Sequence, residues 1–393
     1  MLIKNALVYG EDFQFRKGTI RIEDGIIADI GSEPVSVAGV GEEIVDTKGC
    51  YAIPGLIDIH FHGCMNVDLC DGTLEAVRTL ARYELKAGVT AICPATLTLP
   101  VEELCRILSV AADFKKERDA HKADPAQEPM ADLIGINMEG PFICQVKKGA
   151  QNGAYILPAD ASICEKFLEA SEGLVKIIGL APEENPDFED YIRAVKDRVQ
   201  VSLAHTNADY ETALAAFRAG ACHAVHLYNA MPSFTHRAPG VVGAVSDSPD
   251  VTAELICDGN HVHPSVVRAT FQMLGDDRVV LISDSLRATG LGDGPMILGG
   301  QEVIVKGTRA TLVDGGNLAG SVTNLADCLR IAVKEMGIPL ESAVRAATAN
   351  PAKVLNVSDT YGSLAPGKQG DVVLLDQELR VKAVIKKGIL IEQ

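Results

Sequence analysis

The sequence predicts an α/β fold: a (β/α)₈ TIM-type barrel that carries a small β-sandwich domain formed from both chain termini. Apolar, β-branched runs alternate with helical patterns through the middle of the 393-residue chain. Eight such units over about 250 residues match the size of this barrel. The runs are continuously apolar, which is typical of parallel strands buried on both faces. Alternating strands and tight turns at both ends predict the small domain.

The elements follow one another in a simple order. Residues 1–51 and 351–393 are the two expected parts of the small domain, with short apolar strands separated by Gly, Asp and Pro. Residues 52–350 are the expected barrel. Its eight predicted strands are 52–60, 88–96, 133–139, 175–183, 200–206, 223–230, 251–259 and 279–285. Helical patterns, several of which close on a glycine, separate most of these strands.

Two stretches interrupt the repeat. Residues 114–129 are charged and contain proline, which indicates an exposed helix end and a loop. Residues 290–321 are rich in glycine with alternating apolar residues, which predicts a β-hairpin insertion near 292–318 after the eighth strand.

Composition limits the function classes. The apolar fraction of 47% and charged fraction of 23% are those of a globular protein. No apolar run approaches the ~20 residues that span a bilayer, and the first residues lack a signal-peptide pattern, so we expect a cytoplasmic protein. The net charge of −17 disfavours nucleic acid and anionic membranes as partners. The ten cysteines form no C-x-x-C pair, and we expect them to be reduced.

Polar or titratable residues end most of the predicted strands. They are His60, His62, Thr96, Glu139, Glu183, His205, His226, Asp258 and Asp284. Active sites of such barrels lie at the carboxyl ends of the strands. We therefore expect these side chains to meet at one barrel mouth.

The histidines at these positions have two interpretations. His60 and His62 lie two residues apart and would face the same side of a strand, either as metal ligands or as core residues. Several imidazoles beside Glu139 and Asp284 favour a metal, because buried polar groups need partners. Imidazole and carboxylate ligands suit Zn²⁺, Fe²⁺ or Mn²⁺. Asp284 is placed to act as general base and then acid; the alternative is a helix N-cap.

A series of short motifs runs through nearly the whole chain. They are PGLIDIHFHG (54–63), MEGPF (138–142), KKGAQN (147–152), LAHTNA (203–208), VHLYNAM (225–231), HRAPG (236–240), ICDGNHVHP (256–264), ISDS (282–285), LAGS (318–321) and TANPAKVL (348–355). On these motifs the chain resembles the amidohydrolase superfamily and, within it, the family of N-acetylglucosamine-6-phosphate deacetylases.

The resemblance implies a metal-dependent hydrolase of a phosphorylated amino sugar. It implies Glu139, His205 and His226 as the principal metal ligands and Asp284 as the catalytic residue. The pair His60 and His62 implies a second, adjacent ion, so that one or two divalent cations bind each subunit, with Zn²⁺ favoured over Fe²⁺ or Mn²⁺. Glu139 would bridge the two ions where other amidohydrolases use a carboxylated lysine. A homodimer is also implied, with Arg237 or His261 reaching the neighbouring site.

The resemblance further implies a set of substrate contacts. They are Ala150, Gln151, Asn229, Ala230, Arg237, Asp258, Gly259, Asn260, His261, Leu318, Ala319 and Gly320. Arg237 would hold the 6-phosphate, since a guanidinium binds phosphate in bidentate fashion. Many family members have histidine where this chain has Gln151, which can donate a hydrogen bond but cannot carry positive charge.

The expected reaction is hydrolysis of the acetamide of N-acetylglucosamine 6-phosphate to glucosamine 6-phosphate and acetate. Two alternatives within enzymes are the galacto epimer of this substrate and another N-acyl compound. A third alternative is a scaffold that has kept the barrel and lost its chemistry. The full set of histidines and carboxylates argues against that scaffold.

Overall fold

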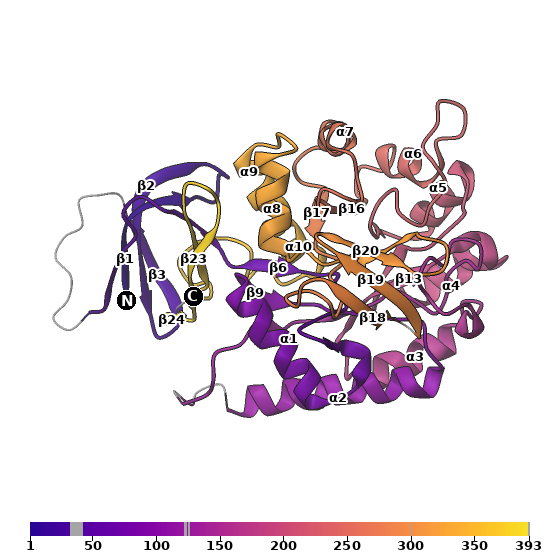
Figure 1. Cartoon of the computed structure of the whole chain (residues 1–393), viewed down its shortest axis with the longest axis horizontal. Coiled ribbons are helices and arrows are strands. Elements are labelled where there is room, and N and C mark those ends of the chain that lie inside the picture. Colours follow the sequence, from indigo (N-terminus) through magenta and orange to yellow (C-terminus); the bar gives the residue numbers. More distant parts are fainter. Residues whose placement is uncertain (32–41, 122–123, 125, 299, 392–393) are drawn as a thin grey trace.

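The computed structural model describes residues 1–31, 42–121, 124, 126–298 and 300–391. A sheet built from both ends of the chain lies beside a larger body of parallel strands and helices (Figure 1). Its strands are β1 (Leu2–Tyr9), β2 (Phe15–Glu23), β3 (Ile26–Gly31), β4 (Ile44–Asp46), β5 (Tyr51–Pro54), β22 (Val372–Leu375), β23 (Val381–Lys386) and β24 (Ile389–Ile391). The order is β24-β23-β22-β5-β1-β2-β3, with β4 beside β1.

The antiparallel pair β5 and β22 joins the two chain ends, with Pro54 opposite Val372 and Tyr51 opposite Leu375. The sheet also curls, because an isolated bridge links Ile26 at the start of β3 to Gln369, just before β22. Its buried faces enclose a separate apolar core, which contains Ile3, Ile20, Ile27, Val372 and Ile385. A separate sheet domain assembled from both termini is therefore present.

The larger body is built on parallel strands that follow the predicted order. One three-stranded sheet contains β6 (Leu56–Asp58), β9 (Val89–Ile92) and β11 (Asp132–Leu133). A seven-stranded sheet contains β10 (Ala95–Thr96), β12 (Ile136–Met138), β13 (Val175–Leu180), β14 (Gln200–Leu203), β15 (His223–Ala224), β16 (Thr252–Ile256) and β17 (Val279–Ile282). Together they form a curled, barrel-like wall. Within the described ranges no ladder joins β17 to β6, so the wall is not a closed ladder.

The structure corrects four strand predictions. The stretches 88–96 and 133–139 each divide between the two parallel sheets, into β9 and β10 and into β11 and β12. The stretch 52–60 is not one strand, because it divides at Gly55 into β5 of the small sheet and β6 of the parallel wall. A Cβ at Gly55 would lie 2.0 Å from Thr90 Oγ1, so this crossing needs glycine. The stretch 223–230 is a strand only in β15. Its remainder turns sharply, with positive φ at His226, Tyr228 and Ala230.

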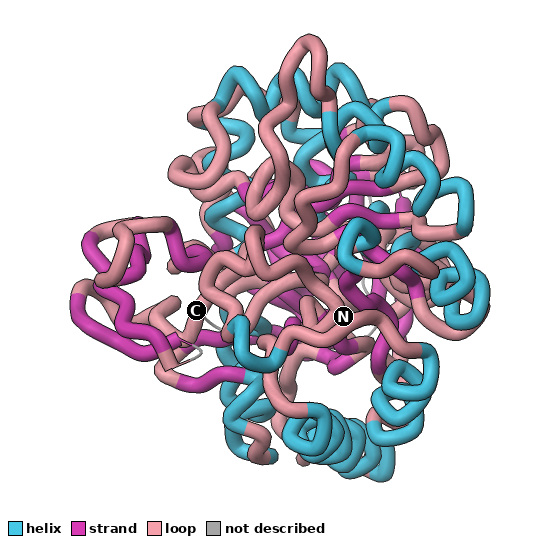
Figure 2. Tube along the Cα trace, turned by 90° about the vertical axis from the view of Figure 1, so that its right-hand side faces the viewer, coloured by secondary structure: helices cyan, strands magenta, loops and turns pink. Residues whose placement is uncertain are grey.

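Helices cover the outside of the parallel strands (Figure 2). They are α1 (Leu74–Lys86), α2 (Val101–Ala120), α3 (Ala161–Ala170), α4 (Phe188–Val195), α5 (Tyr210–Ala219), α6 (Gly240–Ser246), α7 (Pro264–Leu274), α8 (Leu325–Lys334), α9 (Leu340–Ala347) and α10 (Ala349–Val354). Helix α1 shows why they form. Thr73 caps the first turn of the helix, because its side chain accepts a hydrogen bond from the Ala76 N–H. The buried side chains of Val77, Leu80 and Ala81 make one apolar face of the helix.

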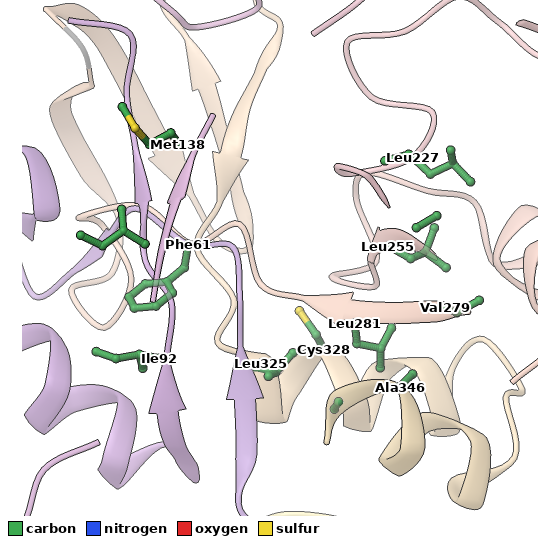
Figure 3. Close-up of a cluster of buried hydrophobic side chains, with 14 of the residues drawn as sticks. Phe61, Ile92, Met138, Leu227, Leu255, Val279, Leu281, Leu325, Cys328 and Ala346 are labelled. Carbon is green, nitrogen blue, oxygen red and sulfur yellow. The ribbon is translucent and has the colours of Figure 1, made fainter. Parts of the chain in front are cut away.

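Phe61, between the two histidines of the first motif, belongs to the main core. It is fully buried and lies near Ile92, Met138 and other apolar side chains of the strands and of α8 (Figure 3). Full burial of such a ring contributes roughly 1.5–3 kcal/mol. Phe61 lies in the core, while the histidines on either side of it both face Glu139.

The predicted hairpin insertion is a four-stranded antiparallel sheet. Its strands are β18 (Gly294–Leu298), β19 (Gln301–Lys306), β20 (Arg309–Leu312) and β21 (Leu318–Ser321). The last strand lies against the segment after β17, where the Ser321 N–H donates to Asp284 O at 2.8 Å and the Leu286 N–H donates to Ser321 O at 2.9 Å. The insertion therefore reaches the carboxyl ends of the parallel strands.

A short hairpin, β7 (Gly63–Cys64) with β8 (Val67–Asp68), follows the first histidine motif. Three 3₁₀ turns lie at residues 69–71, 153–155 and 182–184. Among the helices of the described ranges, none has the length and apolar character needed to cross a membrane.

Candidate metal centre and active site

Six predicted site residues meet at the carboxyl ends of the parallel strands. They are His60 and His62 after β6, Glu139 after β12, His205 after β14, His226 after β15 and Asp284 after β17. All six are buried. His205, His226 and Asp284 have positive φ, a backbone conformation that is uncommon for residues other than glycine and that clusters at functional sites.

Glu139 lies at the centre of the imidazoles. Its Oε1 is 2.8 Å from His205 Nε2 and 2.9 Å from His226 Nε2. Two longer contacts join Oε1 to His60 Nε2 and Oε2 to His62 Nε2, each at 3.4 Å. Four imidazole nitrogens therefore face a single carboxylate.

Outer hydrogen bonds fix how three of these rings point. His205 Nδ1 donates to Lys147 O at 2.8 Å, and His226 Nδ1 donates to Asn229 O at 3.1 Å. His60 Nδ1 lies 2.7 Å from Glu254 Oε2. An acceptor at Nδ1 keeps the proton on that nitrogen and leaves Nε2 as the one that can bind a metal.

The donor set fits a divalent cation. Two groups bring their ligand atoms within 4.8 Å of one another, His60 with Glu139 and His226, and His60 with His62 and Asp284. His60 Nε2 and His62 Nδ1 are buried and have no hydrogen-bond partner among the described residues. Imidazole nitrogen and carboxylate oxygen ligands suit a divalent transition metal such as zinc, iron or manganese.

The carboxylates and imidazoles shift one another's pKa values. Burial alone would lower the pKa of His62, but Asp284 and Glu139 raise it to about 10. Burial opposes the charge of Glu139, yet His205 and the neighbouring rings hold its pKa well below the usual range. The pKa of Asp284 is also lowered, against its burial, by His62 and His60. Without a cation, the cluster therefore holds protons that a metal can displace.

A cavity of about 520 Å³ opens over these side chains. It is the size of a small-molecule site. Eight of the predicted substrate residues line it: Ala150, Gln151, Asn229, Ala230, His261, Leu318, Ala319 and Gly320. Leu318 to Gly320 come from β21, so the insertion forms one wall.

Four predicted substrate residues do not line this cavity. Arg237 is exposed on the loop before α6. Asp258 is buried behind His261, and its Oδ2 is 2.8 Å from His261 Nδ1. Gly259 and Asn260 lie beside it, and Asn260 donates to Thr308 O of the insertion at 2.9 Å. Within one chain, these four residues therefore do not line the cavity.

Gln151 occupies a fixed position in the cavity wall. Its amide nitrogen donates to Glu139 Oε2, and its carbonyl oxygen accepts from the Thr98 N–H at 2.7 Å. Both ends of the side chain are held, and Gln151 is buried.

The sequence analysis missed three residues of the site. Lys147 and Lys148 line the cavity, and their Nζ atoms donate to Met231 O at 3.1 Å and Gln151 O at 3.4 Å. Two adjacent cations in an acidic chain were the available signal. Glu254, which supports His60, lies in the middle of an apolar strand. For Glu254, the available signal was a single acidic residue within an otherwise apolar strand.

Fold and site together define a class, the barrel-type hydrolases whose chemistry depends on a divalent cation held at the strand ends. The chain belongs to the amidohydrolase family, whose family model matches residues 51–391. It is 34% identical to the N-acetylglucosamine-6-phosphate deacetylase of Bacillus subtilis (strain 168) over 389 residues, covering 99% of this chain and 96% of the relative.

Two further comparisons concern the substrate. The N-acetylgalactosamine-6-phosphate deacetylase of Escherichia coli O157:H7 is 33% identical over 371 residues, covering 94% of each chain. A mutant N-acetyl-D-glucosamine-6-phosphate deacetylase from Mycobacterium smegmatis, solved in complex with N-acetyl-D-glucosamine-6-phosphate, superposes with a TM-score of 0.87 at 28% identity. The match covers 100% of this chain and 99% of that structure.

Proposed function

We propose that this chain hydrolyses the acetamide of N-acetylglucosamine 6-phosphate to glucosamine 6-phosphate and acetate. The observation that carries the proposal is the convergence of four histidines, Glu139 and Asp284 beneath one cavity. Relatives that match nearly the whole chain are named as deacetylases of acetylated amino-sugar phosphates.

Glu139, His205 and His226 would hold one divalent ion, and His60, His62 and Asp284 are placed to hold or contact a second. A bound cation would supply a Lewis acid for the amide carbonyl and would lower the pKa of a water molecule to about 7. Zn²⁺ is favoured, with Fe²⁺ and Mn²⁺ as alternatives that share these ligands.

Asp284 moves the protons of the reaction. Its Oδ1 lies 3.4 Å from His62 Nε2 at the floor of the cavity, and its lowered pKa keeps the carboxylate ionised at neutral pH. As general base it accepts the proton of the water that adds to the amide carbon. As general acid it returns that proton to the nitrogen when the C–N bond breaks, so the products are an amine and acetate.

The cavity walls orient the sugar. His261, held by Asp258, and the backbone of Asn229 and Ala230 would contact its hydroxyl groups, while Leu318 to Gly320 would lie against the acetyl methyl group. Gln151 would donate toward the reacting end from its fixed position. Arg237 is exposed in its own chain, and we place it at the phosphate of a neighbouring subunit in a homodimer.

The galacto epimer is a second candidate substrate. The observation that favours it is the relative from Escherichia coli O157:H7, which is 33% identical and named for that epimer. The two sugars differ at one hydroxyl group, so a comparison of kcat/KM on both 6-phosphates and on the unphosphorylated sugar separates the candidates.

The variant Asp284→Asn tests the assignment. Turnover should fall by about 10³–10⁴-fold, since the proton acceptor is lost, while at least the metal at Glu139, His205 and His226 remains bound. Elemental analysis and steady-state kinetics on the same preparation measure both. Asp250→Asn, at an exposed position, is the matched control. Near-native turnover of Asp284→Asn would show that this carboxylate has another role.

Three structural expectations belong to the same proposal. The parallel wall would act as a complete eight-unit barrel, with residues 52–350 as the catalytic unit and residues 1–51 and 351–393 as a two-layered small domain. Hydrogen bonds from the Asp284 N–H to His60 O at 2.9 Å and from the His62 N–H to Ser285 O at 2.8 Å bridge its open edge. We also propose a cytoplasmic location.

A further inference from the structure

A buried acid, Glu254, lies beneath the metal-binding side chains. It is in the middle of β16, between the buried apolar residues Ala253 and Leu255, and is fully buried. No lysine or arginine among the described residues bonds to it. An ionised carboxylate in such surroundings is costly unless other groups compensate it, so its contacts indicate its role.

Both oxygens of Glu254 are occupied. Oε2 is 2.7 Å from His60 Nδ1 and accepts from the His226 N–H at 3.0 Å. Oε1 is 3.1 Å from His223 Nε2 and 3.5 Å from Asn137 Nδ2. His223 is held in turn by Thr252 Oγ1 at 2.7 Å from its Nδ1. This network joins residues of β12, β15 and β16 to His60, which follows β6.

The contact with His60 matters most because His60 is grouped with His62 and Asp284, the side chains placed to hold a second ion. With Nδ1 donating to Glu254, Nε2 is the nitrogen free to bind a metal. That atom lies 3.4 Å from Glu139 Oε1 and 4.0 Å from Asp284 Oδ1, and it has no hydrogen-bond partner among the described residues. Glu254 therefore aims His60 between the two carboxylates.

Glu254 also differs from the supports of the other rings. The Nδ1 atoms of His205 and His226 donate to neutral backbone carbonyls, whereas that of His60 meets a carboxylate. A carboxylate behind an imidazole makes it a stronger ligand than a carbonyl does. Its charge also favours a second dication, which would otherwise be repelled by the first.

We propose that Glu254, backed by His223, is a positioning residue that sets the affinity of the second metal ion, the one that contacts His60, His62 and Asp284. The inference rests on the proposed function in so far as that function includes two ions. Glu254 does not touch substrate, and His60 is the ligand ring that it supports. Its bond to His226 is to the backbone N–H, while the His226 ring is held by Asn229 O.

Metal binding to the cation-free protein tests this directly. Zn²⁺ is titrated in competition with a chromophoric chelator, and bound zinc is counted by elemental analysis. Wild type should bind two equivalents. Glu254→Gln keeps a hydrogen-bond acceptor for His60 but removes the charge, so the weaker equivalent should lose about 10–100-fold in affinity while the tighter one is unchanged.

Two further variants guard against a simple folding defect. Glu254→Asp keeps the charge but withdraws it from His60, and should weaken the same equivalent. Glu84→Gln changes another fully buried carboxyl group, in α1, and should leave both equivalents as in wild type. Thermal melting of each cation-free protein, followed by circular dichroism, identifies the folded variants.

A double-mutant cycle separates action through His60 from a general effect. In the His60→Asn background, which removes the ligand itself, Glu254→Gln should change zinc affinity no further. The proposal is overturned if Glu254→Gln binds both ions as wild type does, if both equivalents weaken together, or if wild type binds one ion. If the wild type binds two ions but does not cleave the acetylated sugar, the proposed function fails and the role of Glu254 still stands.

Discussion

Two buried ionic clusters in this molecule differ in whether their own groups satisfy one another. One surrounds Lys386, where the small sheet meets the barrel wall. Its Nζ donates to Thr90 O at 2.8 Å and to Asp132 Oδ2 and Asp371 Oδ2, each at 2.7 Å. An ammonium group has three donors, and all three are used.

The cluster around Glu139 is not satisfied in this way. His205 Nε2 and His226 Nε2 lie 3.2 Å apart, and His60 Nε2, which also faces Glu139, has no hydrogen-bond partner among the described residues. The difference gives a working criterion. A buried ionic cluster that satisfies its own groups connects parts of a fold, whereas one that leaves ligand atoms convergent and unpaired is built around a further ion.

Among the variants considered, Glu139→Gln, in the cluster around Glu139, should have the largest effect on activity. The amide is a poorer metal ligand and cannot compensate a cation, so bound metal should be lost and kcat/KM should fall by roughly 10³-fold or more. Elemental analysis and kinetics measure the two losses together. Glu169→Gln, exposed on α3, is the control and should change neither. A variant that keeps full metal content would contradict the central position given to Glu139.

Lys386→Met should break the first cluster. Loss of the cation leaves Asp371 buried without a charged partner, which costs about 3–5 kcal/mol in the free energy of unfolding. Metal content and turnover of the folded fraction should not change. Lys387→Met removes a half-exposed partner of Asp132 and should cost about 0–1 kcal/mol. Denaturant unfolding compares the two, and equal costs would remove the distinction between them.

Gln151→Ala tests whether a hydrogen-bond donor in the cavity wall contributes to turnover separately from metal binding. It removes a donor that contacts Glu139 and faces the cavity, so kcat should fall by roughly 10²-fold with little change in metal content. Gln151→His should recover most of that loss, because an imidazole can also donate. Gln145→Ala is the control, since this side chain lines the cavity but its amide donates to Gly153 O. If Gln151→Ala retains wild-type kcat, the donor has no part in the reaction.

The smallest expected effect is a release of protons on metal binding. In the cation-free protein the pKa of His62 is raised to about 10, so its ring is protonated at pH 7 and must lose a proton to bind a metal. A pKa raised on folding stabilises the cation-free protein fully below about pH 6.5, and this contribution is lost as the pH rises through about 10. Zinc affinity should therefore increase with pH over this window.

Calorimetry at pH 7 in buffers of different ionisation enthalpy counts the released protons. Wild type should release at least about one proton per chain when the metal binds, and His62→Asn should release fewer protons. Equal proton release from the two proteins would show that His62 is already neutral before the metal binds.

Local patterns made much of the site predictable from the sequence. Polar residues at the ends of apolar runs included the six converging side chains, because parallel strands end at one edge. Three others of the same pattern, Thr96, Glu183 and Asp258, do not line the cavity. Strand alternation predicted that His60 and His62 share one side, and both do face Glu139, although they lie just beyond the end of β6. The pattern could not show that Gly55 divides the first run, since that break depends on Thr90 from a neighbouring strand.

The sequence could not show which buried charges the fold brings together. Asp132 is far along the chain from Lys386 and Asp371, and each of the three alone resembles a surface charge. Glu254 matched no motif, and its role depends on which histidines the barrel brings to it. The exposed position of Arg237 depends on a loop, which local patterning specifies poorly.

The pairing of β5 with β22 has a consequence for synthesis on the ribosome. Pro54 leaves the ribosome long before Val372, its partner in the ladder, has been made. At about 5–20 residues per second, this interval is on the order of 20–60 s. During it, the hydrogen-bonding edge of β5 that later meets β22 has no partner strand. The small sheet can therefore be completed only after the barrel segment has been translated, and a nascent chain that stops early exposes an open strand edge that invites aggregation.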